Sequence, residues 1–101
     1  MVYEDDFVFA FRDIAPVAPT HILVIPKHKD GLSGISNAEE KHEAILGKLL
    51  IAAAKVAKLE NLEQGYRLVI NEGKHGGQVV PHIHVHILGG KQFTWPPGTS
   101  L

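Results

Sequence analysis

The chain has 101 residues, no cysteine and a formal net charge of −1, because ten Lys and Arg nearly balance eleven Asp and Glu; this length fits a single domain over residues 1–101 with a small core. These values exclude disulfides, zinc–thiolate sites and thiol catalysis, and they argue against a surface that binds nucleic acid. No apolar run reaches the ~18–20 residues that cross a bilayer, and residues 1–6 do not resemble a secretory signal. We therefore expect a protein of the cytoplasm, and also of the nucleus, that has no membrane partner.

Two strands are predicted in the first third of the chain. Aromatic and β-branched residues at 7–11 are typical of a strand. Residues 21–25 are almost continuously apolar, which predicts a second strand that is buried on both faces and is ended by Pro26. Two prolines make residues 15–19 a loop between these strands.

One long amphipathic helix is predicted in the middle of the chain. Ser36 and Glu39 have the spacing of a capping box, with Ser36 as the N-cap residue. Apolar residues then recur at helical spacing up to an expected end between residues 59 and 62.

The second half of the chain predicts a hairpin. Strands at 66–70 and 80–88 are separated by a glycine-rich turn at 71–77, which leaves no room for a crossover helix. The two strands should therefore pair in an antiparallel way. Together these elements predict an α+β fold, in which one long helix packs on an antiparallel sheet of about five strands.

The most informative feature is the histidine row, which consists of His82, His84 and His86 at every second position of the last predicted strand. Alternate residues of a strand share one face, so the three imidazoles should line one side of the sheet. A packed core does not require such a row. The pattern therefore indicates that this face of the sheet carries chemistry.

Three interpretations of the histidine row are open. Two imidazoles can converge on Zn²⁺, but three from one strand need a bend or a ligand from elsewhere, and the sequence offers no cysteine and no obvious nearby carboxylate. Imidazole can instead attack phosphorus or an acyl carbon, while neighbouring histidines and amides of residues 71–78 bind the oxygens. The third interpretation is an exposed strand face without a function. These observations favour the nucleophile.

The histidine row and the motifs around it resemble the histidine triad (HIT) superfamily, in particular its Hint branch of nucleotide-binding proteins. Residues 82–88 match the signature His-φ-His-φ-His-φ-φ, and the tail at 95–98 is similar to that of eukaryotic members. The resemblance implies the HIT-like fold, and the family's N-terminal helical segment is expected to be absent. Further matching motifs are Tyr3-Glu4-Asp5-Asp6, Asp13-Ile14, Ala18-Pro19-Thr20-His21, Val24-Ile25-Pro26-Lys27, Gly65-Tyr66-Arg67, Asn71-Glu72-Gly73, Gly76-Gly77-Gln78 and Leu88-Gly89-Gly90.

The resemblance implies a purine nucleoside phosphoramidase, a hydrolase that cleaves P–N bonds through a covalent nucleotidyl-histidine. By this analogy His84 attacks the α-phosphorus, His86 contacts the phosphate or the leaving group, and His82 orients the network through His21. The implied ligand is an AMP-like purine nucleotide, no metal or cofactor is implied, and a homodimer is expected to form through the long helix and the strand at 66–71. A dinucleoside polyphosphate hydrolase and a nucleotide-binding adaptor remain alternatives.

The same resemblance implies which residues contact the nucleotide. Asp13 would accept hydrogen bonds from both ribose hydroxyls, and Phe11 and Ile14 would line an apolar slot for the base. The phosphate and ribose contacts, partly through backbone amides, are assigned to Asn71, Gly77, Gln78, Val79, His84, Val85 and His86.

Val79 is a departure from the family pattern, because many relatives have serine there and its hydroxyl touches the phosphate. Valine keeps the backbone donor and loses the hydroxyl, so we expect a slower or differently selective enzyme. The remaining histidines, His28, His42 and His75, are predicted to be surface residues without a role.

Overall fold

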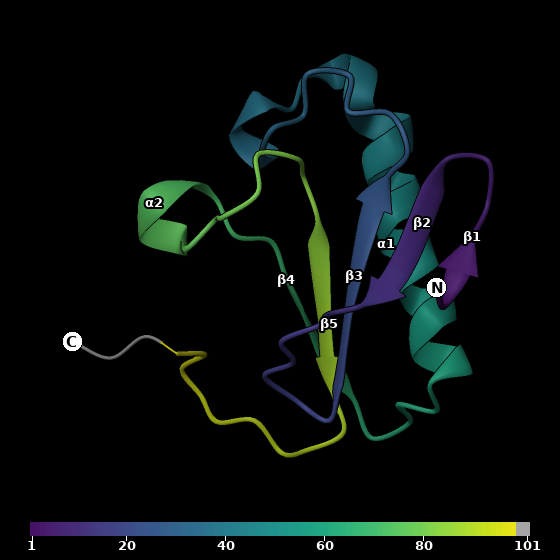
Figure 1. Cartoon of the computed structure of the whole chain (residues 1–101), viewed down its shortest axis with the longest axis vertical. Coiled ribbons are helices and arrows are strands. Elements are labelled where there is room, and N and C mark those ends of the chain that lie inside the picture. The colour runs from purple at the N-terminus through teal and green to yellow at the C-terminus, as the bar shows by residue number, and fades with distance from the viewer. Residues whose placement is uncertain (99–101) are drawn as a thin grey trace.

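Five antiparallel strands form one sheet in the computed structural model, which describes residues 1–98 (Figure 1). The order in the sheet is β1-β2-β3-β5-β4, so β3 and β5 pair with a neighbour on both sides. The predicted α+β fold and the antiparallel pairing of the last two strands are confirmed. The strands are β1 (Tyr3–Glu4), β2 (Val8–Arg12), β3 (Thr20–Pro26), β4 (Tyr66–Val69) and β5 (Val85–Gly89).

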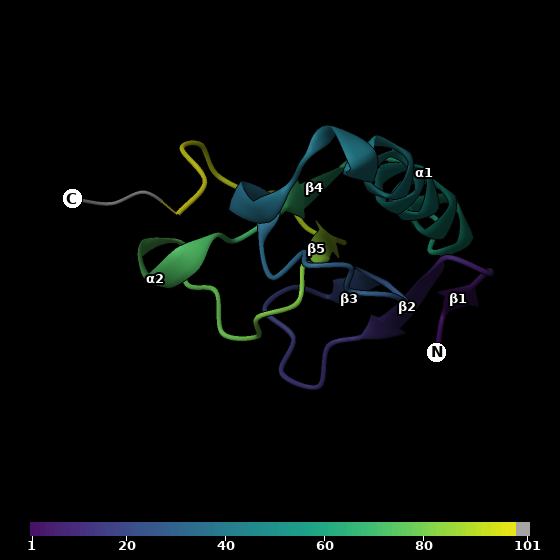
Figure 2. The same ribbon diagram turned by 90° about the horizontal axis from the view of Figure 1, so that it is seen from above.

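The long helix α1 (Glu43–Leu59) covers one face of this sheet (Figure 2). Its buried residues Leu49 and Val56 share one core with Val24 of β3 and Ile87 of β5. Residues next to these in each strand point to the opposite, open face, which no long helix covers within residues 1–98. None of the helices described in this range is long and apolar enough to span a membrane.

The helix begins later than the capping-box spacing predicts. Two short 3₁₀ turns, η1 (Ile35–Asn37) and η2 (Glu40–His42), precede α1. Ser36 is therefore not the N-cap of the helix, and that prediction is wrong. Its backbone N–H donates instead to Glu72 Oε1 at 2.9 Å, a partner from a distant loop that local spacing does not show.

His42 is buried, contrary to its predicted place on the surface. Its side chain is only 1% exposed. The Nδ1 atom accepts the N–H of Glu39 at 3.0 Å, and Nε2 donates to the carbonyl oxygen of Asp30 at 2.9 Å. His42 therefore ties the loop after β3 to the turn that leads into α1.

The last strand also begins later than predicted, at Val85 rather than at residue 80. Pro81 has no N–H to donate to a ladder, and the connection before it contains the one-turn helix α2 (Gly73–Gly76). Gly77 ends α2 with φ at 78°, a left-handed conformation that glycine adopts without strain. His82 and His84 therefore lie on the segment that leads into β5, and α2 stands beyond the β4 edge of the sheet (Figure 1).

Candidate active site

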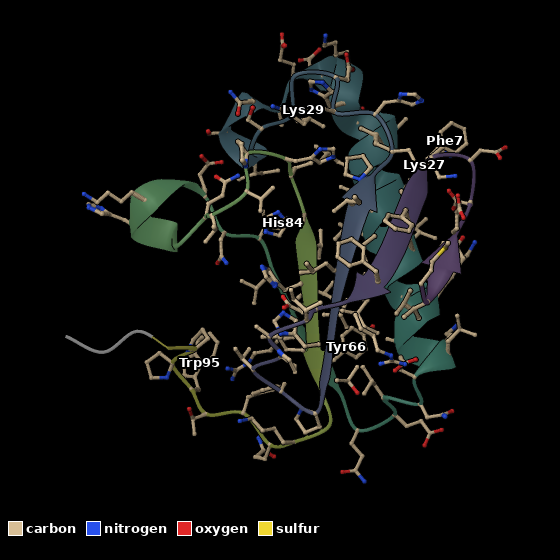
Figure 3. All side chains as sticks on the ribbon, viewed as in Figure 1. Phe7, Lys27, Lys29, Tyr66, His84 and Trp95 are labelled. Atoms are coloured by element: carbon tan, nitrogen blue, oxygen red, sulfur yellow. The ribbon has the colours of Figure 1, made fainter. Side chains whose placement is uncertain are left out.

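The histidines gather on the open face of the sheet, around the start of β5. His86 lies on β5, opposite Leu23 of β3 on one side and Val69 of β4 on the other. Figure 3 shows His84 just before this strand, between β5 and α2. The segment that leads into β5 and the central strands thus bring the predicted catalytic side chains together.

The tautomer of His84 is fixed by the backbone. Its Nδ1 atom lies 2.8 Å from the carbonyl oxygen of His82. A carbonyl oxygen only accepts hydrogen bonds, so Nδ1 carries the hydrogen and Nε2 of the neutral ring keeps its lone pair. The ring stands edge-on to that of His86, with 5.0 Å between centroids. His84 Nε2 is therefore an unprotonated nitrogen on the open face.

His21, through which His82 was expected to orient the network, bonds to His86 instead. His21 Nε2 lies 2.9 Å from His86 Nδ1, and His21 Nδ1 accepts the backbone N–H of Val17 at 3.1 Å. Because its Nδ1 is an acceptor, neutral His21 carries its hydrogen on Nε2 and donates it to His86. His86 then keeps its own hydrogen on Nε2, which lies 3.5 Å from Asn71 Nδ2, an amide nitrogen that is itself a donor and does not accept this hydrogen.

His82 is held by the main chain of β3. Its Nε2 atom donates to the carbonyl oxygen of Pro26 at 3.0 Å. The expected orienting link from His82 to His21 is therefore wrong: His82 supports His84 through its own carbonyl oxygen and anchors the segment before β5.

The pKa of His86 lies below its ordinary value. Burial is the main cause, because it disfavours the charged ring, and the positive charges of protonated His84 and His21 add to the effect, with Asp13 opposing them. His86 therefore stays neutral at neutral pH, in agreement with its Nδ1 atom accepting a hydrogen bond.

Asp13 lies beside this histidine pair. Its Oδ1 atom accepts the N–H of Ala15 at 2.8 Å, and its Oδ2 atom is 3.5 Å from His21 Nε2. Asp13, His21 and His86 each offer one possible ligand atom, and these three atoms lie within 4.8 Å of one another. The expectation that no carboxylate is near the histidines is wrong, because Asp13 directly follows β2, whose antiparallel partner β3 carries His21.

An apolar cavity of about 190 Å³ opens beside His84. Phe11 lines it as expected, whereas Ile14 is fully exposed and lies outside it. Leu23 and Ile25 also line it and were not predicted to do so, although they alternate with buried residues of β3 and share a face with His21. The cavity is lined by Phe11, Leu23, Ile25, Val80, His82 and His84.

The predicted phosphate contacts divide into two groups. Gln78 uses its side-chain amide inside the protein, and its backbone N–H donates to the carbonyl oxygen of Gly73 at 2.9 Å, so it offers no donor to a phosphate. Val85 points its side chain into the core and offers only its backbone. Gly77 and Val79 line a second cavity, of about 390 Å³, which shares Val80 with the first.

A sequence model of the HIT domain matches residues 1–93. The chain belongs to the HIT domain family. A "14 kDa zinc-binding protein" of Zea mays is 65% identical over 98 residues, which are 97% of this chain and 77% of that protein. "Adenylylsulfatase HINT1" of Arabidopsis thaliana is 60% identical over 98 residues, which are 97% of this chain and 67% of that protein. The crystal structure of a HIT family hydrolase from Legionella pneumophila superposes with a TM-score of 0.90 at 51% identity, covering 96% of this chain and 86% of that one.

In this HIT domain the three histidines of the row have three different partners. His82 binds a carbonyl of β3, His84 binds the carbonyl of His82, and His86 binds His21. The neutral rings of His84 and His82 keep an unprotonated nitrogen, Nε2 and Nδ1 respectively, without a hydrogen bond to another described residue, and it is the His84 ring that stands edge-on to His86. The structure therefore distinguishes the three rings by their partners, which alternation along a strand does not do.

Proposed function

We propose that this HIT domain is a hydrolase that cleaves the P–N bond of purine nucleoside 5′-phosphoramidates, with His84 as its nucleophile. The observation that supports the proposal is the bond from His84 Nδ1 to the carbonyl oxygen of His82. It leaves the lone pair on Nε2, and it stabilises the positive charge that the ring gains when Nε2 forms a bond to phosphorus.

The proposed reaction has two steps. His84 Nε2 attacks the α-phosphorus, and the P–N bond breaks as the leaving amine takes its electron pair and a proton from the solvent. Water then attacks the phosphorus of the nucleotidyl-imidazolium, which releases the nucleoside monophosphate and a proton and restores neutral His84. In both steps His86 donates its Nε2 hydrogen to a phosphoryl oxygen, where negative charge accumulates.

The nucleotide would lie along the open face. The purine occupies the apolar cavity beside Phe11 and Leu23, since such sites combine apolar walls with a few polar groups. The ribose hydroxyls donate to Asp13, of which Oδ1 also holds the N–H of Ala15. The backbone amide of Val79 would receive the phosphate, whereas that of Gly77 already donates to the carbonyl oxygen of Lys74 at 3.1 Å.

Adenylyl sulfate is a second candidate substrate. It is favoured by the 60% identity to the Arabidopsis protein named adenylylsulfatase. The same adenylyl group would be transferred to His84, and sulfate would leave as an anion that needs no proton. Both substrates therefore use one nucleophile and differ only in the leaving group.

The test measures turnover of an adenosine phosphoramidate and of adenylyl sulfate, with and without a chelator. We expect chelator-resistant release of AMP, an adenylylated His84 in mass spectra of the quenched protein, and loss of both in His84→Ala. His75→Ala, at an exposed position on α2, is the matched control and should keep full activity. Chelator-sensitive turnover, activity only on dinucleoside polyphosphates, or nucleotide binding without turnover would each contradict the proposal.

We further propose that the protein works as a homodimer through the β4 edge. Tyr66 and Leu68 pair with Gly89 and Ile87 of β5 and share their face with α1, yet each is 40% exposed. Ala54 and Ala57 of α1 line one cavity together with Tyr66. A contiguous apolar surface of this kind marks an interaction site. Sedimentation equilibrium should show a dimer, and Leu68→Glu should convert it to a monomer.

A further inference from the structure

The cluster of Asp13, His21 and His86 has the donor atoms of a zinc site. However, the His21 ring carries its hydrogen on Nε2, the nitrogen that would have to bind the ion. We infer that the backbone N–H of Val17 sets the tautomer of His21, and that this bond closes the cluster to Zn²⁺ and directs the His86 Nε2 hydrogen to the substrate. The statement about the substrate rests on the proposed function, whereas the statements about the tautomer and Zn²⁺ do not.

The donor set itself is of the kind that Zn²⁺ accepts, two imidazole nitrogens and one carboxylate oxygen. His21 Nε2 and His86 Nδ1 face each other at 2.9 Å, with one hydrogen between them. Nitrogens bound to one tetrahedral Zn²⁺ at ~2.0–2.1 Å lie about 3.3 Å apart. An ion would therefore have to replace this hydrogen and separate the two rings by a few tenths of an ångström.

Val17 prevents that replacement. To offer a lone pair at Nε2, neutral His21 must carry its hydrogen on Nδ1, where the Val17 N–H already points at 3.1 Å. Two N–H groups would then face each other, and the amide would lose its acceptor. The loop cannot simply withdraw, because the N–H of Asp13 also bonds to the carbonyl oxygen of His21 at 3.0 Å and the His21 ring is buried.

The same bond has a consequence at His86. With the hydrogen of His21 on Nε2, His86 Nδ1 accepts, and the only hydrogen left on the His86 ring is on Nε2. His86 Nε2 lies 3.5 Å from Asn71 Nδ2, a donor that cannot accept this hydrogen, so the hydrogen is left for a phosphoryl oxygen. Val17 and His21 are thus positioning residues, which act on the phosphate through His86.

The first test uses the unaltered protein. In ¹⁵N spectra of the histidine rings, His21 and His86 should each show a bare Nδ1 and a protonated Nε2. Equimolar Zn²⁺ should leave both sets of signals unchanged. A protonated Nδ1 on His21, or a shift of the His21 and His86 signals with one equivalent of Zn²⁺, would overturn the inference.

The second test removes the donor. Val17→Pro deletes the N–H, while Val17→Ala keeps it and truncates a side chain that is mostly exposed. We expect Zn²⁺ affinity, measured by competition with a chromophoric chelator, to rise roughly 10- to 100-fold in Val17→Pro only. Asp13→Asn in the Val17→Pro background should reverse the gain. A folded Val17→Pro without the gain would contradict the inference, and if this variant does not fold, the ring spectra decide.

Activity separates this inference from the proposed function. In Val17→Pro, measured in the presence of a chelator, we expect kcat for the phosphoramidate to fall while KM changes little, because the His86 tautomer is released and the base cavity is untouched. If the unaltered protein hydrolyses no phosphoramidate, the proposed function fails and the statements about the tautomer and Zn²⁺ still stand or fall on the ring spectra. An unchanged kcat in an otherwise active Val17→Pro would overturn only the statement about His86.

Discussion

Gln78 donates its side-chain amide to the carbonyl oxygen of Ser33 at 2.6 Å, across 45 residues of sequence. The same nitrogen donates to the carbonyl oxygen of Val80 at 3.1 Å, and Oε1 accepts the N–H of Gly73 at 3.0 Å. One side chain therefore closes the loop around α2 and fastens it to the loop after β3. Figure 1 shows these two loops at the same end of the sheet.

We predict that Gln78→Ala lowers the free energy of unfolding by about 1–2 kcal/mol, because it removes three hydrogen bonds to partly buried or exposed backbone groups. It should also raise KM for the nucleotide, since the amide of Val79 loses its fixed place. Urea denaturation and steady-state kinetics measure the two effects. Gln78→Glu should be equally harmful, because a carboxylate cannot donate to the two carbonyl oxygens; a fully stable and active Gln78→Glu would contradict this prediction.

His42→Ala should lower the free energy of unfolding by about 2–4 kcal/mol, through loss of a buried ring and of its two hydrogen bonds to the main chain. The matched control is His28→Ala, an exposed histidine, which should stay within roughly 0.5 kcal/mol. Thermal or urea unfolding compares the variants. Similar values for the two alanine variants would show that the burial of His42 is unimportant.

The strands and the long helix could be predicted from the sequence because their signals are local and periodic. The nearly continuous apolar run of β3 and the spacing of Leu49 and Val56 in α1 each require a buried face. The late start of α1 could not be predicted in the same way. It depends on His42 bonding to Asp30 and on Glu72 reaching Ser36, which are contacts between distant segments.

The site shows the same division between local and distant signals. Alternation predicted that the histidine row carries chemistry, but the row is not a continuous strand, because β5 starts only at Val85. The pairing of His21 with His86, and the approach of Asp13, follow from the antiparallel neighbours β2, β3 and β5. Sheet order and register decide such contacts, and neither is visible in the spacing along one strand.

Asp5 gives the stability a dependence on pH. Its Oδ1 atom accepts the N–H groups of Phe7 at 2.8 Å and Val8 at 2.9 Å, and these bonds hold the pKa of the carboxyl below its ordinary value, with Phe7 the larger cause. A lowered folded-state pKa stabilises the protein above the unfolded-state pKa of ~3.9, and the contribution is lost as the pH falls through the folded-state value.

We therefore predict that Asp5→Asn lowers the free energy of unfolding by about 0.5–1.5 kcal/mol at pH 7. The difference from the unaltered protein should shrink as the pH falls below the unfolded-state pKa. Urea denaturation at several pH values tests this. Asp6→Asn, at the exposed neighbouring position, should show no such dependence, and a constant deficit of Asp5→Asn at every pH would argue against the charge as the cause.

Val79 is where the proposed chemistry can be altered without disturbing the fold. Its side chain is 88% exposed at the rim of the cavity that also contains Gly77 and Lys74. Val79→Ser would place a hydroxyl at the expected position of the phosphate, so we predict a rise in kcat of up to about tenfold. This is less than the ~10²–10³ that a preorganised oxyanion donor contributes, because an exposed hydroxyl also bonds to water. Val79→Thr, which keeps the shape of valine, should show a similar rise, whereas Val79→Ala should not. Unfolding free energies should stay within roughly 0.5 kcal/mol of the unaltered protein in all three variants. A higher kcat in Val79→Ser and Val79→Thr but not in Val79→Ala would then be due to the hydroxyl. An equal rise in Val79→Ala would contradict this prediction and show that the valine side chain obstructs the leaving group.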